Sequence, residues 1–170
     1  TFITMSSELR VNRIIPVDGV PSGGGGGIVQ VRHATQTSQI TNTATSYVNL
    51  ISCQIIPIVT GSKIYVIGNV NNYSNQVNNG DWTNSCYIKL SENSTRVAQY
   101  EHPGPVSQMQ FSQVIPVHYL SDAKTAGTTY TYTIAAKNTS SGDTHYYGRS
   151  TDGAAQAVNG CRITLMEVSA

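Results

Sequence analysis

The amino-acid sequence predicts an all-β protein, an antiparallel β-sandwich resembling a jelly roll, with an extended N-terminal arm. Val and Ile supply 31 of the 170 residues and Leu only 5, which favours strands over helices. Roughly eight short apolar segments alternate with turn signals about every 8–15 residues, the spacing typical of sandwiches and jelly rolls. No stretch of about ten residues shows the 3.6-residue period of an amphipathic helix.

The first 27 residues predict an arm rather than part of the sandwich. Leu9–Pro16 alternates apolar and polar residues well enough for one short strand, which is too little to bury itself. Gly23–Gly27 follows as a flexible hinge, because five glycines lose much backbone entropy when they become ordered. Phosphate binding by this run is disfavoured, since Ile28-Val29-Gln30 follows instead of the Lys-Ser/Thr of a P-loop. The arm is interpreted as a docking strand for another protein's sheet, with a disordered leader as the alternative.

Residues 28–170 predict the sandwich domain. The alternation of a strand is clearest in 128–136, where Tyr130, Tyr132 and Ile134 share one face and are expected to pack in the core. Pro57 and Pro116 indicate edge strands, because proline lacks a ladder donor. The expected strands, in order, are Ile28–Arg32, Tyr47–Ile58, Lys63–Val70, Cys86–Leu90, Arg96–Gln99, Phe111–Leu120, Thr128–Ala136, His145–Tyr147 and Cys161–Val168.

Charge is scarce, and its scarcity excludes several partners. Only 11% of the residues are charged and the net charge is +1, whereas an ordinary soluble domain has about 25% charged residues. Nucleic acid and anionic membranes are therefore not expected as partners. No apolar run approaches the roughly 18 residues needed to span a bilayer, and the first residues lack the pattern of a signal peptide.

The sequence contains no motif that predicts catalysis, a cofactor or a metal site. His102 follows Glu101, but no nucleophile motif accompanies this pair, so it is interpreted as a surface histidine. A pair of acids for glycoside hydrolysis is not favoured by any spacing, which leaves a polysaccharide depolymerase as an outside alternative. Three widely spaced cysteines, Cys53, Cys86 and Cys161, are expected to be buried free thiols.

The exposed chemistry is neutral hydrogen bonding with aromatic faces. Ser, Thr, Asn and Gln together supply 60 residues, and several aromatic residues stand among them in expected loops. Such surfaces suit sugars, and they also suit protein epitopes through Tyr and Trp anchors. The candidate ligand-binding residues are Tyr73, Asn75, Asn79, Trp82, His102, Tyr146 and Tyr147.

Three segments of the sequence are distinctive: SSELRVNRIIPVDGVPSGGGGGIVQV, then TSYVNL with IIPIVTGSKIYVIGNV, and finally CRITLMEVSA. Together they resemble a family of small phage virion proteins, the tail-fibre and head-fibre proteins of marine and cyanobacterial phages. The similarity covers roughly half of the chain, and the middle, Asn71–Gly160, is similar in style only. Residues Thr1–Thr4 precede a Met-Ser-Ser start, so either the start is misplaced or the chain is a piece of a longer fibre.

The resemblance implies a homotrimeric β-sandwich of the virion, assembled in the host cytoplasm, without enzymatic activity. It also implies that the arm anchors the protein to other tail or capsid proteins. The anchoring residues would be Leu9, Val11, Ile14, Ile15 and Val17. The function expected first is a receptor-binding tail fibre that attaches the particle to a host surface glycan or protein. A head fibre or capsid decoration protein with a structural role is the alternative.

Overall fold

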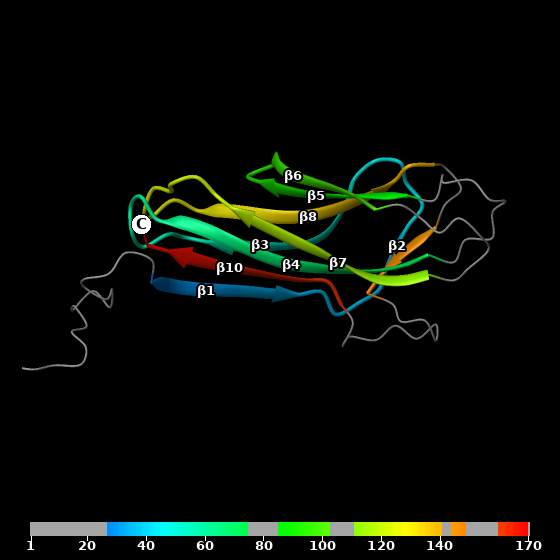
Figure 1. Cartoon of the computed structure of the whole chain (residues 1–170), viewed down its shortest axis with the longest axis horizontal. Coiled ribbons are helices and arrows are strands. Elements are labelled where there is room, and N and C mark those ends of the chain that lie inside the picture. The colour runs from blue at the N-terminus through cyan, green and yellow to red at the C-terminus, as the bar shows by residue number, and fades with distance from the viewer. Residues whose placement is uncertain (1–26, 75–84, 103–110, 141–143, 149–159, 170) are drawn as a thin grey trace, which may run out of the picture.

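The computed structural model describes residues 27–74, 85–102, 111–140, 144–148 and 160–169, and these form two packed antiparallel sheets (Figure 1). We name the sheets A and B. The strands of sheet A are β1 (Ile28–Thr35), β10 (Arg162–Val168), β4 (Lys63–Ser74), β7 (Phe111–Leu120) and the short β9 (His145–Tyr147) and β2 (Ile40–Asn42). Those of sheet B are β3 (Val48–Ile55), β8 (Tyr130–Asn138), β5 (Cys86–Glu92) and β6 (Thr95–His102).

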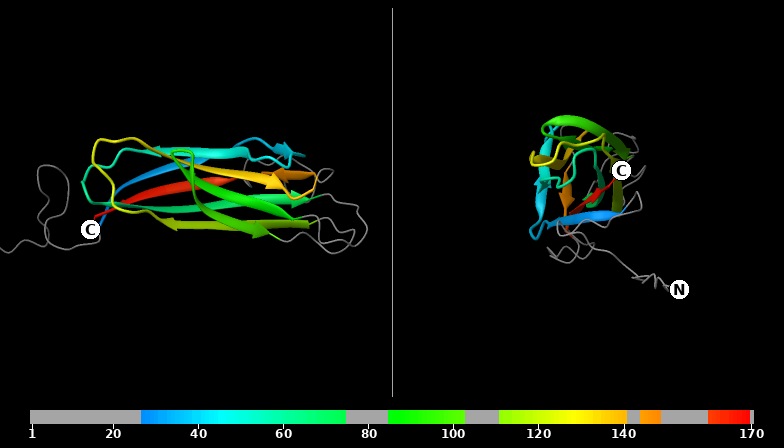
Figure 2. Two further views of the ribbon diagram at one scale, coloured as in Figure 1. Left: turned by 90° about the horizontal axis from the view of Figure 1, so that it is seen from above. Right: turned by 90° about the vertical axis from the view of Figure 1, so that its left-hand side faces the viewer.

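The strand order is that of a jelly roll. Sheet A runs β1-β10-β4, with β7 on the other edge of β4, and sheet B runs β3-β8-β5-β6. Along the chain, the connections β2–β3, β3–β4, β4–β5, β6–β7, β7–β8 and β8–β9 cross from one sheet to the other, whereas β5 and β6 are neighbours in sheet B. Figure 2 shows the two layers edge-on. The predicted β-sandwich is confirmed, while the predicted arm before Gly27 lies outside the described residues.

The core forms where alternating strand residues meet between the sheets. In β10, Ile163 and Leu165 are buried, and in β8, Tyr132 and Ile134 are buried as the alternation predicts. Full burial of one such side chain contributes about 1.5–3 kcal/mol, so this layer dominates the stability of the domain. Gly68 of sheet A leaves room for Ile134 of sheet B, because a Cβ there would stand 2.8 Å from Ile134 Cδ1.

Several strand boundaries differ from the predicted ones, and β1, β6 and β8 each extend beyond the predicted C-terminal end, to Thr35, His102 and Asn138. The expected strand Tyr47–Ile58 ends at Ile55, and Pro57 lies in the following loop. β4 continues beyond Val70 to Ser74, because β7 and β9 pair with both of its edges there. β5 extends to Glu92, and β2 is a strand that the polar residues around it did not predict.

One buried carboxylate joins three segments that are distant in sequence. Glu167, on β10, is fully buried and accepts hydrogen bonds from the backbone N–H groups of Ile58 (3.0 Å) and Val59 (2.9 Å). It also accepts from the hydroxyl of Ser62 (2.7 Å) and from Gln30 Nε2 (2.7 Å) on β1. Burial alone would raise the pKa of the Glu167 carboxyl, but these hydrogen bonds outweigh it and hold the pKa below its ordinary value.

The loop between β7 and β8 is fastened to the same region. Gly61 N–H donates to the carbonyl of Lys124, and Lys124 N–H donates to the carbonyl of Ser62, each at 2.8 Å. The Lys124 ammonium lies 2.5 Å from Glu92 Oε1, and Tyr132 donates to the other oxygen of Glu92 at 2.9 Å. Loops 56–62 and 121–129 therefore form one hydrogen-bonded layer.

Both ends of the described chain meet at this layer, because Ser169 N–H donates to the carbonyl of Gly27 at 3.0 Å. We call this end of the sandwich the proximal end. At the opposite, distal end, β4 ends at Ser74 beside the start of β7 at Phe111, and β6 ends at His102 beside the start of β5 (Figure 1). No helix in the described part of the chain is long and apolar enough to cross a membrane.

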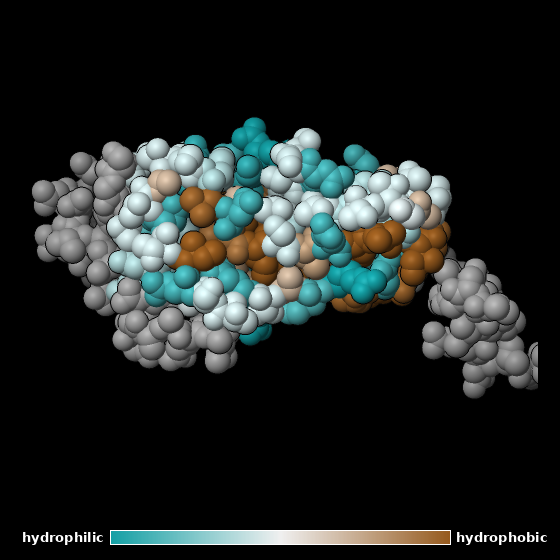
Figure 3. Space-filling model, turned by 180° about the vertical axis from the view of Figure 1, so that it is seen from behind, coloured by the Kyte–Doolittle hydropathy of each residue, from teal (hydrophilic) through white to brown (hydrophobic). Residues whose placement is uncertain are grey.

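Large apolar side chains remain at the surface on both edges of sheet A. Ile28 and Val31 on β1, and Val114 and Leu120 on β7, are each more than half exposed. Ile56 and Ile58, in the proximal loop, are also at least half exposed. Figure 3, which views the sandwich from behind, shows apolar residues gathered at one end and along the middle of that face.

Replacing Glu167 by Gln is expected to destabilise the fold by about 1–3 kcal/mol for each buried donor that loses its acceptor. The pKa of this carboxyl is lower in the folded than in the unfolded chain, so its contribution is full above the ordinary pKa of about 4.3 and is lost as pH falls further. Urea denaturation of wild type and Glu167→Gln should give a free-energy difference at pH 7 that shrinks on acidification.

Asp122→Asn is the matched control, since Asp122 is exposed and should change the free energy of unfolding by no more than about 0.5 kcal/mol. A Glu167→Gln variant as stable as Asp122→Asn would contradict the role given to this carboxylate.

Candidate functional site

The outer face of sheet B is polar across all four strands. Its side chains alternate with the core residues, and the register places them in rows. One row joins Asn49, Ala135, Lys89 and Gln99, with Ala135 fully covered by its neighbours. The next row consists of Ser52, Thr133, Ser91 and Arg96.

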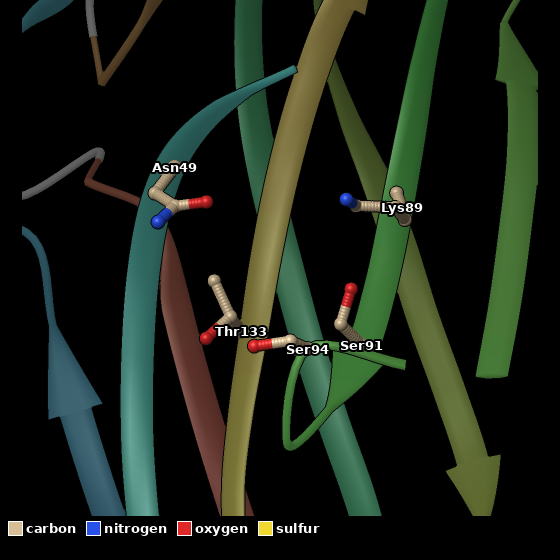
Figure 4. Close-up of a pocket in the computed structure, with 5 residues that line it drawn as sticks. All are labelled: Asn49, Lys89, Ser91, Ser94 and Thr133. Carbon is tan, nitrogen blue, oxygen red and sulfur yellow. The ribbon is translucent and has the colours of Figure 1, made fainter. Parts of the chain in front are cut away.

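These rows border a hollow of about 130 Å³ on the surface of sheet B (Figure 4). Its lining comes from β3, β5, β8 and the turn between β5 and β6. In Figure 4 the ammonium of Lys89 points across the hollow toward the amide of Asn49. The lining residues are Asn49, Lys89, Ser91, Ser94 and Thr133.

The rim of the hollow is shaped by a tight turn with unusual backbone angles. Asn93 (φ 46°) and Ser94 (φ 72°) both adopt the left-handed region, as a two-residue type I′ hairpin requires. Asparagine tolerates this conformation, whereas for a serine it is uncommon. Asn93 fastens the turn to β8, because its N–H donates to Thr131 O (2.8 Å) and its Oδ1 accepts from Thr131 N–H (2.9 Å). These two hydrogen bonds keep Ser94 at the rim of the hollow.

Aromatic rings and cations lie beside the hollow. The ammonium of Lys89 is 4.4 Å from the centre of the Tyr47 ring, and that of Lys137 is 5.3 Å from it. Lys137 also lies 5.1 Å from the Tyr87 ring. The Tyr47 hydroxyl donates to Gln99 Oε1 at 3.0 Å, which fixes the ring. Burial raises the pKa of Tyr47, so its hydroxyl is neutral and remains a donor.

The charges on this face are mostly positive. Arg96, Lys89 and Lys137 are cationic, and Glu101 provides the carboxylate, which raises the pKa of Tyr87 beside it. The ion pair between Lys124 and Glu92 lies away from this face, at the proximal end. The lysines of this face therefore lie against aromatic rings rather than against carboxylates.

Those predicted ligand-binding residues that the structure describes do not line the hollow. Tyr73 was expected in a loop and Tyr147 in a short strand with an exposed ring, but both are buried strand residues, of β4 and β9, because the pairing of these strands extends sheet A to the distal end. Tyr146 is half-buried, with its ring centre 5.8 Å from that of Tyr73. His102 ends β6 at the distal end.

The remaining predicted residues fall outside the described residues and stay predictions. They are Asn75, Asn79 and Trp82 of the expected ligand loop, and Leu9, Val11, Ile14, Ile15 and Val17 of the expected anchor. None of the residues that line the hollow was singled out from the sequence. The Thr-Tyr alternation of β8 was a usable signal, because a core-facing Tyr132 places Thr131 and Thr133 on the outer face.

A buried polar cluster lies behind the distal strands. His145 Nδ1 and Asn72 Oδ1 are 3.1 Å apart, and Asn72 Nδ2 lies 3.5 Å from the sulfur of Cys86. All three cysteines are free and buried, as predicted. Burial raises the pKa of Cys86 to about 12 and that of Cys161 to about 11, which leaves them as inert thiols at neutral pH. In the described ranges, no three His, Cys, Asp or Glu side chains are grouped to hold a metal ion.

No protein-family model and no curated protein matches this chain. Among solved structures, it is similar to the insecticidal delta-endotoxin Cry8Ea1 from Bacillus thuringiensis, with 12% identity and a TM-score of 0.43 over 77% of this chain and 20% of that one. It is also similar to dimeric latent PorU from Porphyromonas gingivalis, with 7% identity and a TM-score of 0.35 over 86% and 14%.

A third similar structure is that of infectious bursal disease virus, Gx strain, with 12% identity and a TM-score of 0.37 over 95% of this chain and 42% of that one. The chain thus spans less than half the length of each of these proteins. At these identities the similarity concerns the fold alone.

The three cysteines should resist alkylation by iodoacetamide at pH 8 in the folded protein, because burial disfavours the reactive thiolates. Cys53, on the edge strand β3 and 7% exposed, should react first. Mass spectrometry of peptides after timed alkylation would measure the order, and alkylation in urea provides the control in which all three react. Rapid labelling of Cys86 without urea would contradict its burial.

Proposed function

We propose that this chain is a non-enzymatic phage virion protein of the tail-fibre type, which attaches the particle to a glycan on the host surface. The observation that carries this proposal is the outer face of sheet B. There a hollow lined by amide, hydroxyl and ammonium groups lies beside the rings of Tyr47 and Tyr87. Flat aromatic faces with hydrogen-bonding groups are the chemistry that recognises sugars.

The two ends of the sandwich differ, and this difference supports attachment at one end only. Gly27 and Ser169 meet at the proximal end, and the glycine run Gly23–Gly27 leads directly into β1. An arm that leaves there would join the particle at the proximal end and leave sheet B and the distal end free to face a cell. The family resemblance of the sequence, with its conspicuous arm and hinge, agrees with this orientation.

A head fibre or capsid decoration protein remains the second candidate, and the apolar edges of sheet A favour it. Such a protein would bury Ile28, Val31 and the proximal Ile56 and Ile58 against the particle rather than bind a host molecule.

We also propose that the protein is a homotrimer. Sheet A exposes apolar side chains on both of its edges, Val31 on β1 and Leu120 on β7. The register connects these two residues through Met166 and Tyr65, so one continuous apolar row crosses the outer face of the sheet. A contact between the β1 edge of one copy and the β7 edge of the next is heterologous, and three such contacts can close a ring.

Attachment is tested with fluorescently labelled full chain incubated with a panel of marine bacteria and cyanobacteria. Tyr47→Ala should reduce cell binding by about tenfold or more on any strain that binds, because it removes the ring that positions Lys89. Thr128→Ala, at an exposed loop position outside both the hollow and the apolar row of sheet A, is the control and should leave cell binding unchanged. Equal binding by wild type and Tyr47→Ala would reject sheet B as the attachment face.

The second candidate makes a different prediction for the particle. If the chain is a decoration protein, it should bind purified capsids through the proximal end and ignore every strain of the panel. Negative-stain microscopy of particles labelled through an antibody to the chain would locate it on the tail or on the capsid.

Size-exclusion chromatography with light scattering should give three times the 18.2 kDa of one chain. Leu120→Asp should shift the mass toward the monomer, because it places a charge in the apolar row. Thr128→Asp adds the same charge at an exposed loop position and should leave the mass unchanged. A wild-type mass of 18.2 kDa would overturn the trimer.

A further inference from the structure

We propose that the hollow on sheet B binds the oxyanion of an acidic sugar, a carboxylate or a sulfate group, within a host-surface polysaccharide. This inference deepens the proposed function and rests on it for the location of the polysaccharide on a cell. It specifies the charge class of the ligand and the side chain that recognises it, Lys89.

The first argument is the unbalanced charge. Arg96, Lys89 and Lys137 stand on the outer face of sheet B with Glu101 as the carboxylate of the same face. Glu101 lies beside Tyr87, one row away from Lys89. Lys89 is half-buried over the Tyr47 ring, and no ion pair to it exists in the part of the chain that the structure describes. An anionic ligand would complete this arrangement.

The second argument is the geometry around the ammonium. Ser91, Ser94 and Thr133 place hydroxyl groups around the hollow, and Asn49 places an amide across from Lys89 (Figure 4). Hydroxyl and amide N–H groups can donate to the oxygens of an anion that the ammonium does not reach. Hydrogen bonds to a charged acceptor are about twice as strong as neutral ones, so this lining favours an oxyanion over a neutral hydroxyl.

The third argument is that the site is held in place before a ligand arrives. The Tyr47 ring lies under Lys89 and is itself fixed by its hydrogen bond to Gln99. Asn93 holds the turn that carries Ser94, whose left-handed backbone is uncommon for serine. Strained backbone of this kind is concentrated at binding sites, where it fixes the position of a side chain.

The size of the hollow indicates a sugar substituent rather than a polymer backbone. A volume of about 130 Å³ holds a carboxylate or sulfate group with part of its sugar ring. Tyr87, near Lys137, offers a further ring for the neighbouring sugar.

The test measures binding of the full chain to immobilised polygalacturonate, dextran sulfate and neutral dextran by biolayer interferometry. Wild type should bind at least one acidic polymer about tenfold or more tightly than dextran, because one charge-assisted contact contributes about tenfold in affinity. In 0.5 M NaCl this binding should weaken, because salt screens the attraction between the ammonium and the anion. Preference for polygalacturonate or for dextran sulfate would identify carboxylate or sulfate as the group bound.

Lys89→Gln should lower the affinity for the acidic polymer about tenfold and leave dextran binding unchanged. Lys63→Gln is the matched control, because Lys63 is an exposed lysine on sheet A and its loss changes the net charge equally. Thr133→Val, which removes one hydroxyl from the hollow, should weaken binding without loss of charge. Thermal melts of all three variants verify that they remain folded.

Equal losses in Lys89→Gln and Lys63→Gln would overturn the inference, since binding would then follow net charge alone. It would also be overturned if dextran bound as tightly as the acidic polymers, or if double-stranded DNA bound as tightly with the same dependence on Lys89. Attachment to cells without affinity for either acidic polymer would reject this ligand class and leave the proposed function standing. Affinity for an acidic polymer without attachment to any strain would do the reverse.

Discussion

The arrangement of this sandwich depends on one buried carboxylate. An ionised acid inside a β domain is stable only when hydrogen-bond donors surround it, and Glu167 obtains them from the loop 56–62 and from β1. The last strand is thereby tied to the first strand and to a loop from the other sheet. The ordered loop in turn holds the segment 121–129 through Lys124. This chain of contacts brings Gly27 and Ser169 together at one end.

The two outer faces of the sandwich have different chemistry although the same alternation produces both. Sheet A presents an apolar row that runs from Val31 to Leu120, whereas sheet B presents hydroxyls, amides and three cations. The low charge of the chain therefore does not mean a uniform surface. On sheet B, Lys89 and Lys137 lie against the rings of Tyr47 and Tyr87. Because few carboxylates lie near them, these two cations make the local electrostatic potential positive.

Much of the fold could be predicted, because periodicity is a local property of the sequence. The alternation of Tyr130, Tyr132 and Ile134 predicted the core face of β8 correctly. The site could not be predicted in this way. Asn49, Lys89 and Thr133 become neighbours only through the register of β3, β5 and β8, and a single sequence contains no signal for register between distant strands. The burial of Glu167 was missed for the same reason, since its donors lie more than a hundred residues away in the chain.

The hydrogen bond between Ser169 and Gly27 has a mechanical consequence. If the proximal end were joined to a particle and sheet B were bound to a ligand, a force on the particle would pull on β1 along the long axis of the domain. The hydrogen bonds between β1 and β10 are perpendicular to that axis, so the load would fall on all of them in shear rather than open them one at a time. If the chain attaches a particle as we propose, this arrangement would resist detachment by drag on the particle, because the whole ladder of hydrogen bonds would have to break together.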